Sequence, residues 1–265
     1  MAKMKFSMMT YTMMRQKCFT PEDCVRVAVE LGMDGIDWVT TYDRDPRELK
    51  KLSDDAGLPV AAHTFFLRKD DMPQLESSAA RHLDDAVTLG APVVMIPPAV
   101  HPGITTLEEC RKLWIGILQK VAPLAAERGI ALSVENFPNP ISAVVTADDF
   151  YALKAEVPGL KLTFDNGNAA SGEDQIASLK RCYRDIVHVH FKDWQRRDDP
   201  AEGWKLMRDG RYYQAALIGE GVVDSRATLR ELEKLGYDGF INIEYENLTY
   251  RGDEAIKRAL EYLRG

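Results

Sequence analysis

Four polar residues stand at or near the ends of apolar runs that have the composition of buried β-strands. Glu135 ends the run ALSVE, Asp165 ends KLTFD, His190 lies in IVHVHF and Glu244 follows FINI. Three carboxylates and one imidazole in such surroundings are costly unless a bound group compensates them, and a divalent cation is the simplest such group. The set therefore predicts a metal-dependent enzyme that holds one ion.

The side-chain types narrow the choice of metal. Three hard oxygen ligands and one nitrogen ligand suit Mn²⁺ or Mg²⁺ first, with Co²⁺ and Zn²⁺ as further options. Taken singly, a carboxylate at a strand end is about as often a helix cap or an ion-pair partner as a ligand. The metal prediction rests on the four residues together, because otherwise each of them needs a separate structural role at the same place.

Eight β-rich runs alternate with amphipathic segments along the chain, which is typical of βα units around a parallel sheet. Eight such units predict an α/β protein with one (β/α)8 TIM-barrel domain over residues 1–265. An open doubly wound sheet is the alternative, but the sequence has neither of the glycine-rich nucleotide-binding motifs that would favour it. In a barrel the carboxyl ends of all strands meet at one mouth, so the four candidate ligands become neighbours. The runs are KFSMMT, GIDWVT, LPVAAHT, APVVMIP, IALSVEN, LKLTFDN, IVHVHF and FINIEYE.

The composition excludes several functions. The 265 residues include 34 Lys and Arg against 41 Asp and Glu, a net charge of −7, which leaves no broad basic surface for nucleic acid. No stretch approaches the length of a membrane span, and the opening MAKMKFSMMTYTMMR lacks the long apolar core of a secretion signal. The four cysteines form no Cys-x-x-Cys pair and are expected to be reduced. We therefore expect a cytoplasmic protein that binds neither nucleic acid nor membrane.

The chain resembles the xylose isomerase-like TIM barrels, also called the sugar phosphate isomerase/epimerase superfamily, over nearly its whole length. The most specific matches are SVEN with Glu135, FDNGN with Asp165, HVHFKD with His190, IGEGVVD over 218–224 and NIEYE with Glu244. Members hold one divalent metal with a Glu, Asp, His, Glu quartet on these strands. The resemblance therefore implies the same four ligands here.

Two neighbouring positions bear on this quartet. His188 could also face the mouth, since residues two apart share a strand face, but the family's His-x-Lys-Asp pattern favours His190 as the ligand. Asn168 falls where several relatives carry a second histidine that touches substrate or another metal. This departure argues against the three-metal DNA-repair branch and for a centre with one metal, with Asn168 as a substrate contact.

Further substrate-binding residues follow from the same resemblance. His63 ends the third run, where relatives contact bound sugar; the alternative is a structural histidine. Lys192 could bind an anionic or carbonyl oxygen, and Asp193 could orient the metal histidine or bond a hydroxyl, unless both form surface ion pairs. Arg196 lies where ketose epimerases often carry a basic residue. Lys192, Asp193 and Arg196 belong to the long aromatic-rich segment 192–224, which we expect to be irregular and to form a wall or lid of the pocket.

The resemblance implies a carbohydrate substrate and chemistry next to a carbonyl group. The leading expectation is an isomerase, specifically a sugar epimerase or aldose-ketose isomerase that works through a metal-stabilised enediolate, with Glu135 and Glu244 as the acid/base pair. The alternatives are a dehydratase of the inosose or dehydroshikimate type, and a sugar-binding barrel without turnover. Relatives commonly form dimers or tetramers, so a homo-oligomer is a further option.

Overall fold

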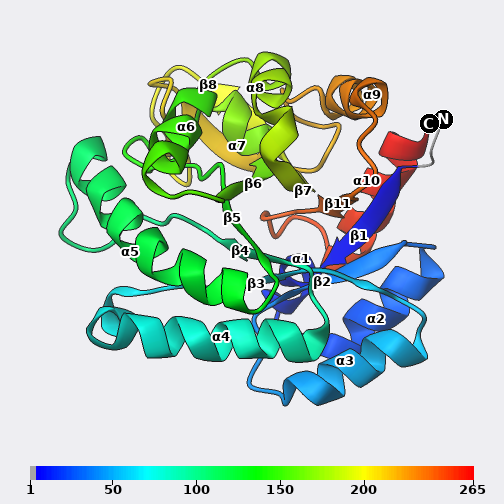
Figure 1. The fold of residues 1–265 in the computed structure, drawn as a ribbon. Coiled ribbons are helices and arrows are strands. Elements are labelled where there is room, and N and C mark those ends of the chain that lie inside the picture. Colours follow the sequence, from blue (N-terminus) through cyan, green and yellow to red (C-terminus); the bar gives the residue numbers. More distant parts are fainter. Residues whose placement is uncertain (1–3) are drawn as a thin grey trace.

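The computed structural model describes residues 4–265 and confirms a closed barrel of eight parallel strands surrounded by helices (Figure 1). Residues 1–3, which begin the opening segment considered for secretion, lie outside the described residues. Around the barrel the strand order is β1-β11-β7-β6-β5-β4-β3-β2. The strands are β1 (Lys5–Met9), β2 (Gly35–Val39), β3 (Val60–Thr64), β4 (Val93–Ile96), β5 (Ala131–Glu135), β6 (Lys161–Asp165), β7 (Ile186–Phe191) and β11 (Phe240–Ile243).

Closure of the barrel depends on β1, which pairs in parallel with both β11 and β2. Met8 is in register with Ile243 on one side and with Ile36 on the other, and all three side chains are buried. Such runs of apolar residues are expected for strands that are covered by helices on the outside and fill the barrel on the inside. The closed sheet therefore brings all strand ends to one mouth.

Helices follow the strands and cover the barrel (Figure 1). Pro21 begins α2, where the Thr20 side chain accepts a hydrogen bond from the backbone N–H of Asp23. Just after α2, Gly32 adopts a φ of 58°, a left-handed conformation that favours glycine. The α-helices are α1 (Thr10–Met14), α2 (Pro21–Glu30), α3 (Pro46–Asp55), α4 (Leu75–Leu89), α5 (Leu107–Glu127), α6 (Ala147–Glu156), α7 (Asn166–Ala170), α8 (Gln175–Cys182), α9 (Ser225–Leu235) and α10 (Gly252–Arg264), and the 3₁₀ turns are η1 (Lys69–Gln74) and η2 (Tyr183–Asp185).

The segment 192–224 is more ordered than the sequence predicts. It contains a three-stranded antiparallel sheet with the order β8-β10-β9, made of β8 (Asp193–Arg197), β9 (Lys205–Leu206) and β10 (Tyr212–Ala216). Buried aromatic and aliphatic side chains of the segment account for this order, because they form an apolar cluster of their own. The buried members of that cluster are Trp194, Met207, Tyr213 and Val223.

The remaining sequence expectations concern membranes and cysteines. Among the described residues, no helix has both the length and the apolar character needed to cross a bilayer. Cys18, Cys24, Cys110 and Cys182 are free thiols, and all except Cys18 are buried.

Candidate functional site

The four predicted ligands converge at the mouth of the barrel. Glu135 and Asp165 end β5 and β6, His190 lies near the end of β7, and Glu244 directly follows β11. These four strands are consecutive neighbours in the barrel. All four side chains are buried, and one ligand atom from each lies within 4.8 Å of the others.

His190 lies at the centre of this group. Its Nδ1 atom lies 2.8 Å from Oε1 of Glu135 and 3.7 Å from Oε2 of Glu244. Its other ring nitrogen, Nε2, points away from Glu135 and Glu244 and lies 3.0 Å from Nδ2 of Asn242. The ring therefore presents Nδ1, which could ligate a metal, to the carboxylates of the cluster.

Two oxygen atoms of the cluster suit a cation because no group of the described residues donates a hydrogen bond to them. Oδ2 of Asp165 and Oε2 of Glu244 are buried and accept no hydrogen bond. The remaining oxygen of Asp165, Oδ1, accepts a hydrogen bond of 2.7 Å from the backbone N–H of Asn168, which fixes the orientation of this carboxylate. A buried carboxylate oxygen without a donor is costly, and a divalent cation would compensate both atoms at once.

Lys192 is the internal counter-charge of the cluster. Its Nζ atom donates hydrogen bonds of 2.9 Å to Oε1 of Glu244 and to Oε1 of Glu246, and lies 3.5 Å from Oδ2 of Asp165. The ammonium is buried, and although burial lowers the pKa of Lys192, the surrounding carboxylates raise it well above its ordinary value. Lys192 therefore remains charged inside the site.

One ammonium does not balance all these carboxylates. Burial raises the pKa of Asp165 to about 7, although Lys192 acts in the opposite direction. Burial likewise raises the pKa of Glu244 well above its ordinary value against the effect of Lys192. The pKa of His190 is lowered by burial, but its interactions with the carboxylates of Asp37 and Glu135 raise it to about 10. The cluster therefore holds more negative charge than Lys192 alone can stabilise, which is the electrostatic environment of a cation site.

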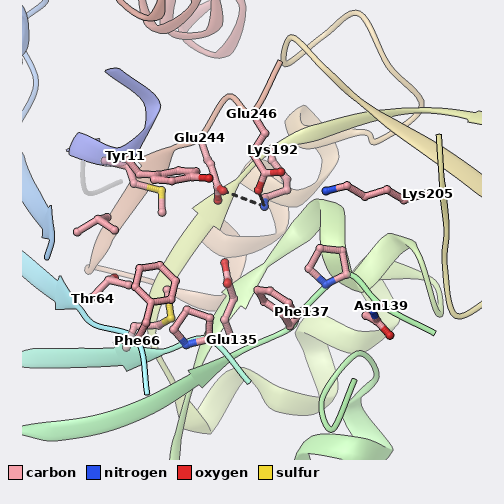
Figure 2. Close-up of a pocket in the computed structure, with 15 residues that line it drawn as sticks. Tyr11, Thr64, Phe66, Glu135, Phe137, Asn139, Lys192, Lys205, Glu244 and Glu246 are labelled. Carbon is pink, nitrogen blue, oxygen red and sulfur yellow. Dashed lines mark hydrogen bonds and ion pairs between the residues drawn. The ribbon is translucent and has the colours of Figure 1, made fainter. Parts of the chain in front are cut away.

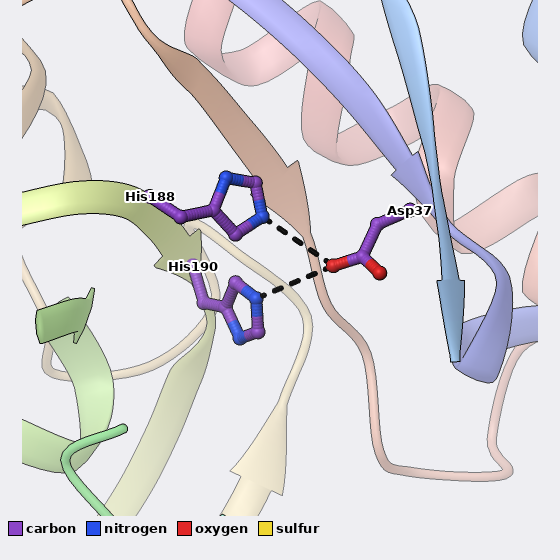
Figure 3. Close-up of side chains that lie close together, drawn as sticks. All are labelled: Asp37, His188 and His190. Atoms are coloured by element: carbon purple, nitrogen blue, oxygen red, sulfur yellow. Dashed lines mark ion pairs between the residues drawn. The ribbon is translucent and has the colours of Figure 1, made fainter. Parts of the chain in front are cut away.

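A second group of polar residues, Asp37 and His188, lies beside His190 (Figure 3). Oδ2 of Asp37 lies 3.8 Å from Nε2 of His190 and 3.4 Å from Nε2 of His188, and it accepts a hydrogen bond of 2.6 Å from Asn242. Asp37, His188 and His190 could by themselves offer three ligand atoms to a cation. We favour the Glu135 group as the metal centre, because it has four ligands and borders a cavity, whereas Asp37 and His188 are closed off from solvent.

The cavity above the cluster has a volume of about 380 Å³ (Figure 2). Glu135 and Glu244 border it directly, and its wall combines polar groups with apolar side chains. A pocket that is largely apolar with a few charged groups at one point is typical of small-molecule sites. The lining residues are Met9, Tyr11, Val39, Thr64, Phe66, Met95, Pro97, Glu135, Phe137, Pro138, Asn139, Lys192, Lys205, Glu244 and Glu246.

Of the five predicted substrate-binding residues, only Lys192 borders this cavity. His63 is fully buried and contacts the carbonyl oxygen of Trp38 through Nδ1 at 2.7 Å. Asn168 is also buried, and its side-chain amide donates a hydrogen bond of 2.8 Å to the carbonyl of Asn136.

Asp193 and Arg196 also lie away from the cavity lining. The carboxylate of Asp193 accepts hydrogen bonds of 2.8–2.9 Å from the backbone N–H groups of Trp194, Gly219, Gly221 and Val223. Arg196 is exposed on β8 and borders a separate surface pocket. Three residues of the motif IGEGVVD (218–224) therefore donate backbone hydrogen bonds to Asp193, which fixes this turn.

Several residues of the site were missed in the sequence. Glu246 stands two positions after Glu244, so the alternation of side chains near a strand end could have indicated it. Asp37 lies within the apolar run GIDWVT, where a buried charge needs a partner. For Lys205 the sequence contains no signal, because its position depends on how segment 192–224 folds.

Comparisons with known proteins identify relatives that are enzymes. The inosose dehydratase of Geobacillus thermodenitrificans (strain NG80-2) is 26% identical over 266 residues, which cover 92% of this chain and 86% of that protein. Inosose dehydratases of Clostridium and Lacticaseibacillus species match at 24–27% identity. These matches extend over most of both chains and support an enzyme.

Solved structures share the fold. The probable 3-DHS dehydratase AsbF from Bacillus anthracis has a TM-score of 0.76 at 20% identity, covering 99% of both chains. The IOLI protein with a bound zinc atom has a TM-score of 0.75 at 20% identity, covering 97% of this chain and 96% of that one. Structures of epimerases match similarly well, with TM-scores of 0.76 and 0.77. At such low identity these matches show the fold alone.

The expectation of an isomerase or epimerase is wrong in the light of these relatives. The relatives described above are named inosose dehydratase, which favours the dehydratase alternative. The physical reason for the error is that both reactions begin by removing a proton next to a carbonyl group. The four ligands alone therefore do not distinguish them.

The family itself was correctly predicted. A family model described as xylose isomerase-like TIM barrel matches residues 25–265, which include all four candidate ligands. The closed barrel of parallel strands agrees with this match. The chain belongs to the xylose isomerase-like TIM barrel family.

Proposed function

We propose that the protein is a divalent-metal-dependent dehydratase that removes water from a polyhydroxylated cyclic ketone of the inosose type. The observation that carries this proposal is the buried cluster of Glu135, Asp165, His190 and Glu244 beside a cavity of about 380 Å³. The relatives named inosose dehydratase support the reaction class. The cavity volume suits a ligand the size of a sugar or cyclitol.

The four clustered residues are the metal ligands in this proposal. The two oxygen atoms without hydrogen-bond donors, on Asp165 and Glu244, support this role. Mn²⁺ and Mg²⁺ suit three carboxylates and one imidazole, and Co²⁺ and Zn²⁺ also accept such ligands. When bound, a divalent ion supplies the Lewis acidity that makes a hydrogen next to the ketone easier to remove.

Glu135 and Glu244 are the residues that move protons. Their strands β5 and β11 lie at the two ends of the four-strand arc, with β6 and β7 between them, so the two carboxylates approach a ligand from different sides. One carboxylate takes the proton from the carbon next to the ketone. The other donates a proton to the departing hydroxyl, so that a C–H and a C–O bond break, a C=C bond forms and water leaves.

Lys192 contributes a fixed positive charge at the edge of the cavity. Its ammonium is held by Glu244 and Glu246 and borders the cavity, where it can donate a hydrogen bond to a substrate oxygen. This is consistent with its predicted role in substrate binding. Tyr11 and Phe66 border the same cavity and offer faces against which a ring can pack.

The test is direct measurement of dehydration. Purified protein loaded with Mn²⁺ is incubated with an inosose, and we expect the absorbance of an unsaturated ketone to rise with loss of one water by mass spectrometry. Glu244→Gln should abolish the reaction, whereas Lys51→Met, a change on the exposed surface of α3, should leave it intact. If the metal-loaded protein exchanges or epimerises the substrate without ever losing water, the proposal is wrong.

A further inference from the structure

The mouth of the barrel has two chemically different halves. The four candidate metal ligands lie at the ends of β5, β6, β7 and β11, whereas β1 to β4 line the cavity with Met9, Val39, Thr64 and Met95. Val39 is in register with Thr64, and Thr64 with Met95, so their side chains point to the same face of the sheet, here the inside of the barrel. All four side chains are buried. We call Met9, Val39 and Met95 the apolar wall of the cavity, because their side chains have no hydrogen-bond donor.

Polar groups near the apolar wall are few. The carbonyl oxygens of Thr64 and Met95 already accept hydrogen bonds of 2.8 and 3.2 Å from backbone N–H groups. The hydroxyl group of Thr64 is buried, makes no hydrogen bond to any described residue and could serve at most one substrate oxygen. Tyr11 also borders the cavity, but Figure 2 shows its hydroxyl end directed toward Glu244. A substrate hydroxyl that lies against the apolar wall therefore loses its bound water without gaining an equivalent partner, which weakens binding.

The apolar wall leads toward a second cavity. Phe66 and Pro97 border both the cavity above the ligand cluster and this neighbouring cavity, and each of the two has a volume of about 380 Å³. The lining of the second cavity is mainly apolar, and its charged residues, 68–70, are exposed. Figure 2 shows Thr64 and Phe66 on one side of Glu135. A substituent that projects from a bound ring toward this side therefore meets apolar side chains and has room beyond them.

We propose that the apolar wall binds a methyl ether, so that the preferred substrate is an inosose-type ketone in which one ring hydroxyl away from the ligand cluster carries an O-methyl group. This inference rests on the proposed function for the reaction and names a substituent of the substrate. Methylation removes the hydroxyl that would face the wall, and the added methyl group packs against flexible methionine side chains. A ring that merely lacks this hydroxyl is disfavoured, because it would leave the space beside Phe66 and Pro97 unfilled.

The experiment compares probes that differ in methylation alone. myo-Inositol and its 1-, 4- and 5-O-methyl ethers share a ring with neighbouring hydroxyl groups, and without a ketone they do not react. Their dissociation constants are measured by calorimetry with the Mg²⁺-loaded protein. We expect at least one ether to bind about five- to tenfold more tightly than myo-inositol, because its methyl group leaves water and no hydroxyl faces the wall. The deoxy-inositol that lacks the same hydroxyl should bind less tightly than this ether.

Variants of similar side-chain size assign the preference to the apolar wall. Val39→Thr and Met95→Gln each place a polar group in the wall, and each should bring the affinities for the ether and for myo-inositol to within about twofold of each other. Val29→Thr is the matched control, because it makes the same change at an exposed position of α2 and should keep the full preference.

Several results would overturn the proposal. These are equal or weaker binding of all three ethers, no measurable binding of any probe, equal binding of the best ether and the deoxy-inositol, or an unchanged preference in the wall variants. Failure of the proposed function looks different, because dehydration would then be absent for an inosose and for its methyl ethers alike, while the unreactive probes would still show the preference for the ether.

Discussion

Lys192 donates a hydrogen bond of 2.9 Å to Oε1 of Glu244 and thereby decides which oxygen of this carboxylate remains free. The other oxygen, Oε2, has no hydrogen-bond donor and lies 3.7 Å from Nδ1 of His190. The lysine thus acts behind the ligand cluster, where it orients Glu244 and neutralises part of its charge. Mutation of groups that orient metal ligands in this way typically costs about 10–100-fold in metal affinity or activity.

Replacing Lys192 with methionine should destabilise the metal-free protein. The change leaves Glu244 and Glu246 without their shared cation, and breaking a buried ion pair on one side costs about 3–5 kcal/mol. Urea unfolding at pH 7 in the presence of a chelator measures this loss. Added Mn²⁺ should restore part of it, and Lys51→Met on the exposed surface of α3 should change stability by less than about 0.5 kcal/mol. A Lys192→Met variant as stable as the natural protein would contradict this account of the charge balance.

Removing one ligand charge should weaken metal binding strongly. Glu135→Gln and Glu244→Gln should each lower the affinity for Mn²⁺ by at least about 100-fold, measured by calorimetry or by metal content after dialysis. Glu246→Gln is a matched control, because it lies close by but outside the ligand cluster, and its effect should stay below about tenfold. Equal effects at all three positions would mean that net charge alone, and no defined ligand set, attracts the ion.

His63 should make stability depend on pH below neutrality. Burial lowers the pKa of His63 from its ordinary value of 6.5 to about 4. Between these values the unfolded chain binds the proton and the folded protein does not, so stability is complete above pH 6.5 and falls as pH drops toward 4. Between pH 6.5 and 4 the free energy of unfolding should fall by about 3 kcal/mol because of His63.

The measurement is urea unfolding between pH 4.5 and 7. His63→Asn keeps a donor for the carbonyl of Trp38 but does not titrate, so the slope of stability against pH should become shallower in this variant. If His63 were already protonated in the folded protein, the free energy of unfolding would change with pH in parallel in the natural protein and the variant, which would contradict the prediction.

Gly221 should be intolerant of a side chain. A Cβ atom there would lie 2.2 Å from Oδ1 of Asp193 and 2.3 Å from the carbonyl oxygen of Trp194, so the loop held by Asp193 must shift. We expect Gly221→Ala to cost about 1–3 kcal/mol and to increase proteolysis within segment 192–224. Gly116→Ala in α5 is the matched control, because its Cβ meets nothing within 4 Å and should stabilise the helix by about 0.5–1 kcal/mol.

The sequence predicts most of the fold and the four clustered residues of the candidate metal site. Alternating apolar runs and capped helices specify the barrel, and the placement of Glu135, Asp165, His190 and Glu244 on successive strands follows from barrel geometry. These inferences succeed because strand ends in a closed parallel barrel always meet at one mouth.

Other features were beyond the sequence for identifiable reasons. The small sheet that carries Lys205 is stabilised by an apolar cluster whose members are up to 29 positions apart, from Trp194 to Val223, so no local pattern reveals it. Asp193 reads as a substrate contact in the sequence, yet both of its oxygens are taken by backbone N–H groups of a distant turn. The choice between epimerase and dehydratase depends on how a substrate is held, which the ligand residues do not encode.

Closure of the barrel between β1 and β11 also has a consequence for synthesis. Ser7 on β1 and Asn242 on β11 are hydrogen-bonded although they are 235 positions apart. Until β11 has left the ribosome, β1 and β7 each present an unpaired edge, and such edges attract other strands. The nascent chain is therefore exposed to misassociation until nearly all of it has been made. Glu244, which completes the ligand cluster, arrives with the same strand that seals these edges.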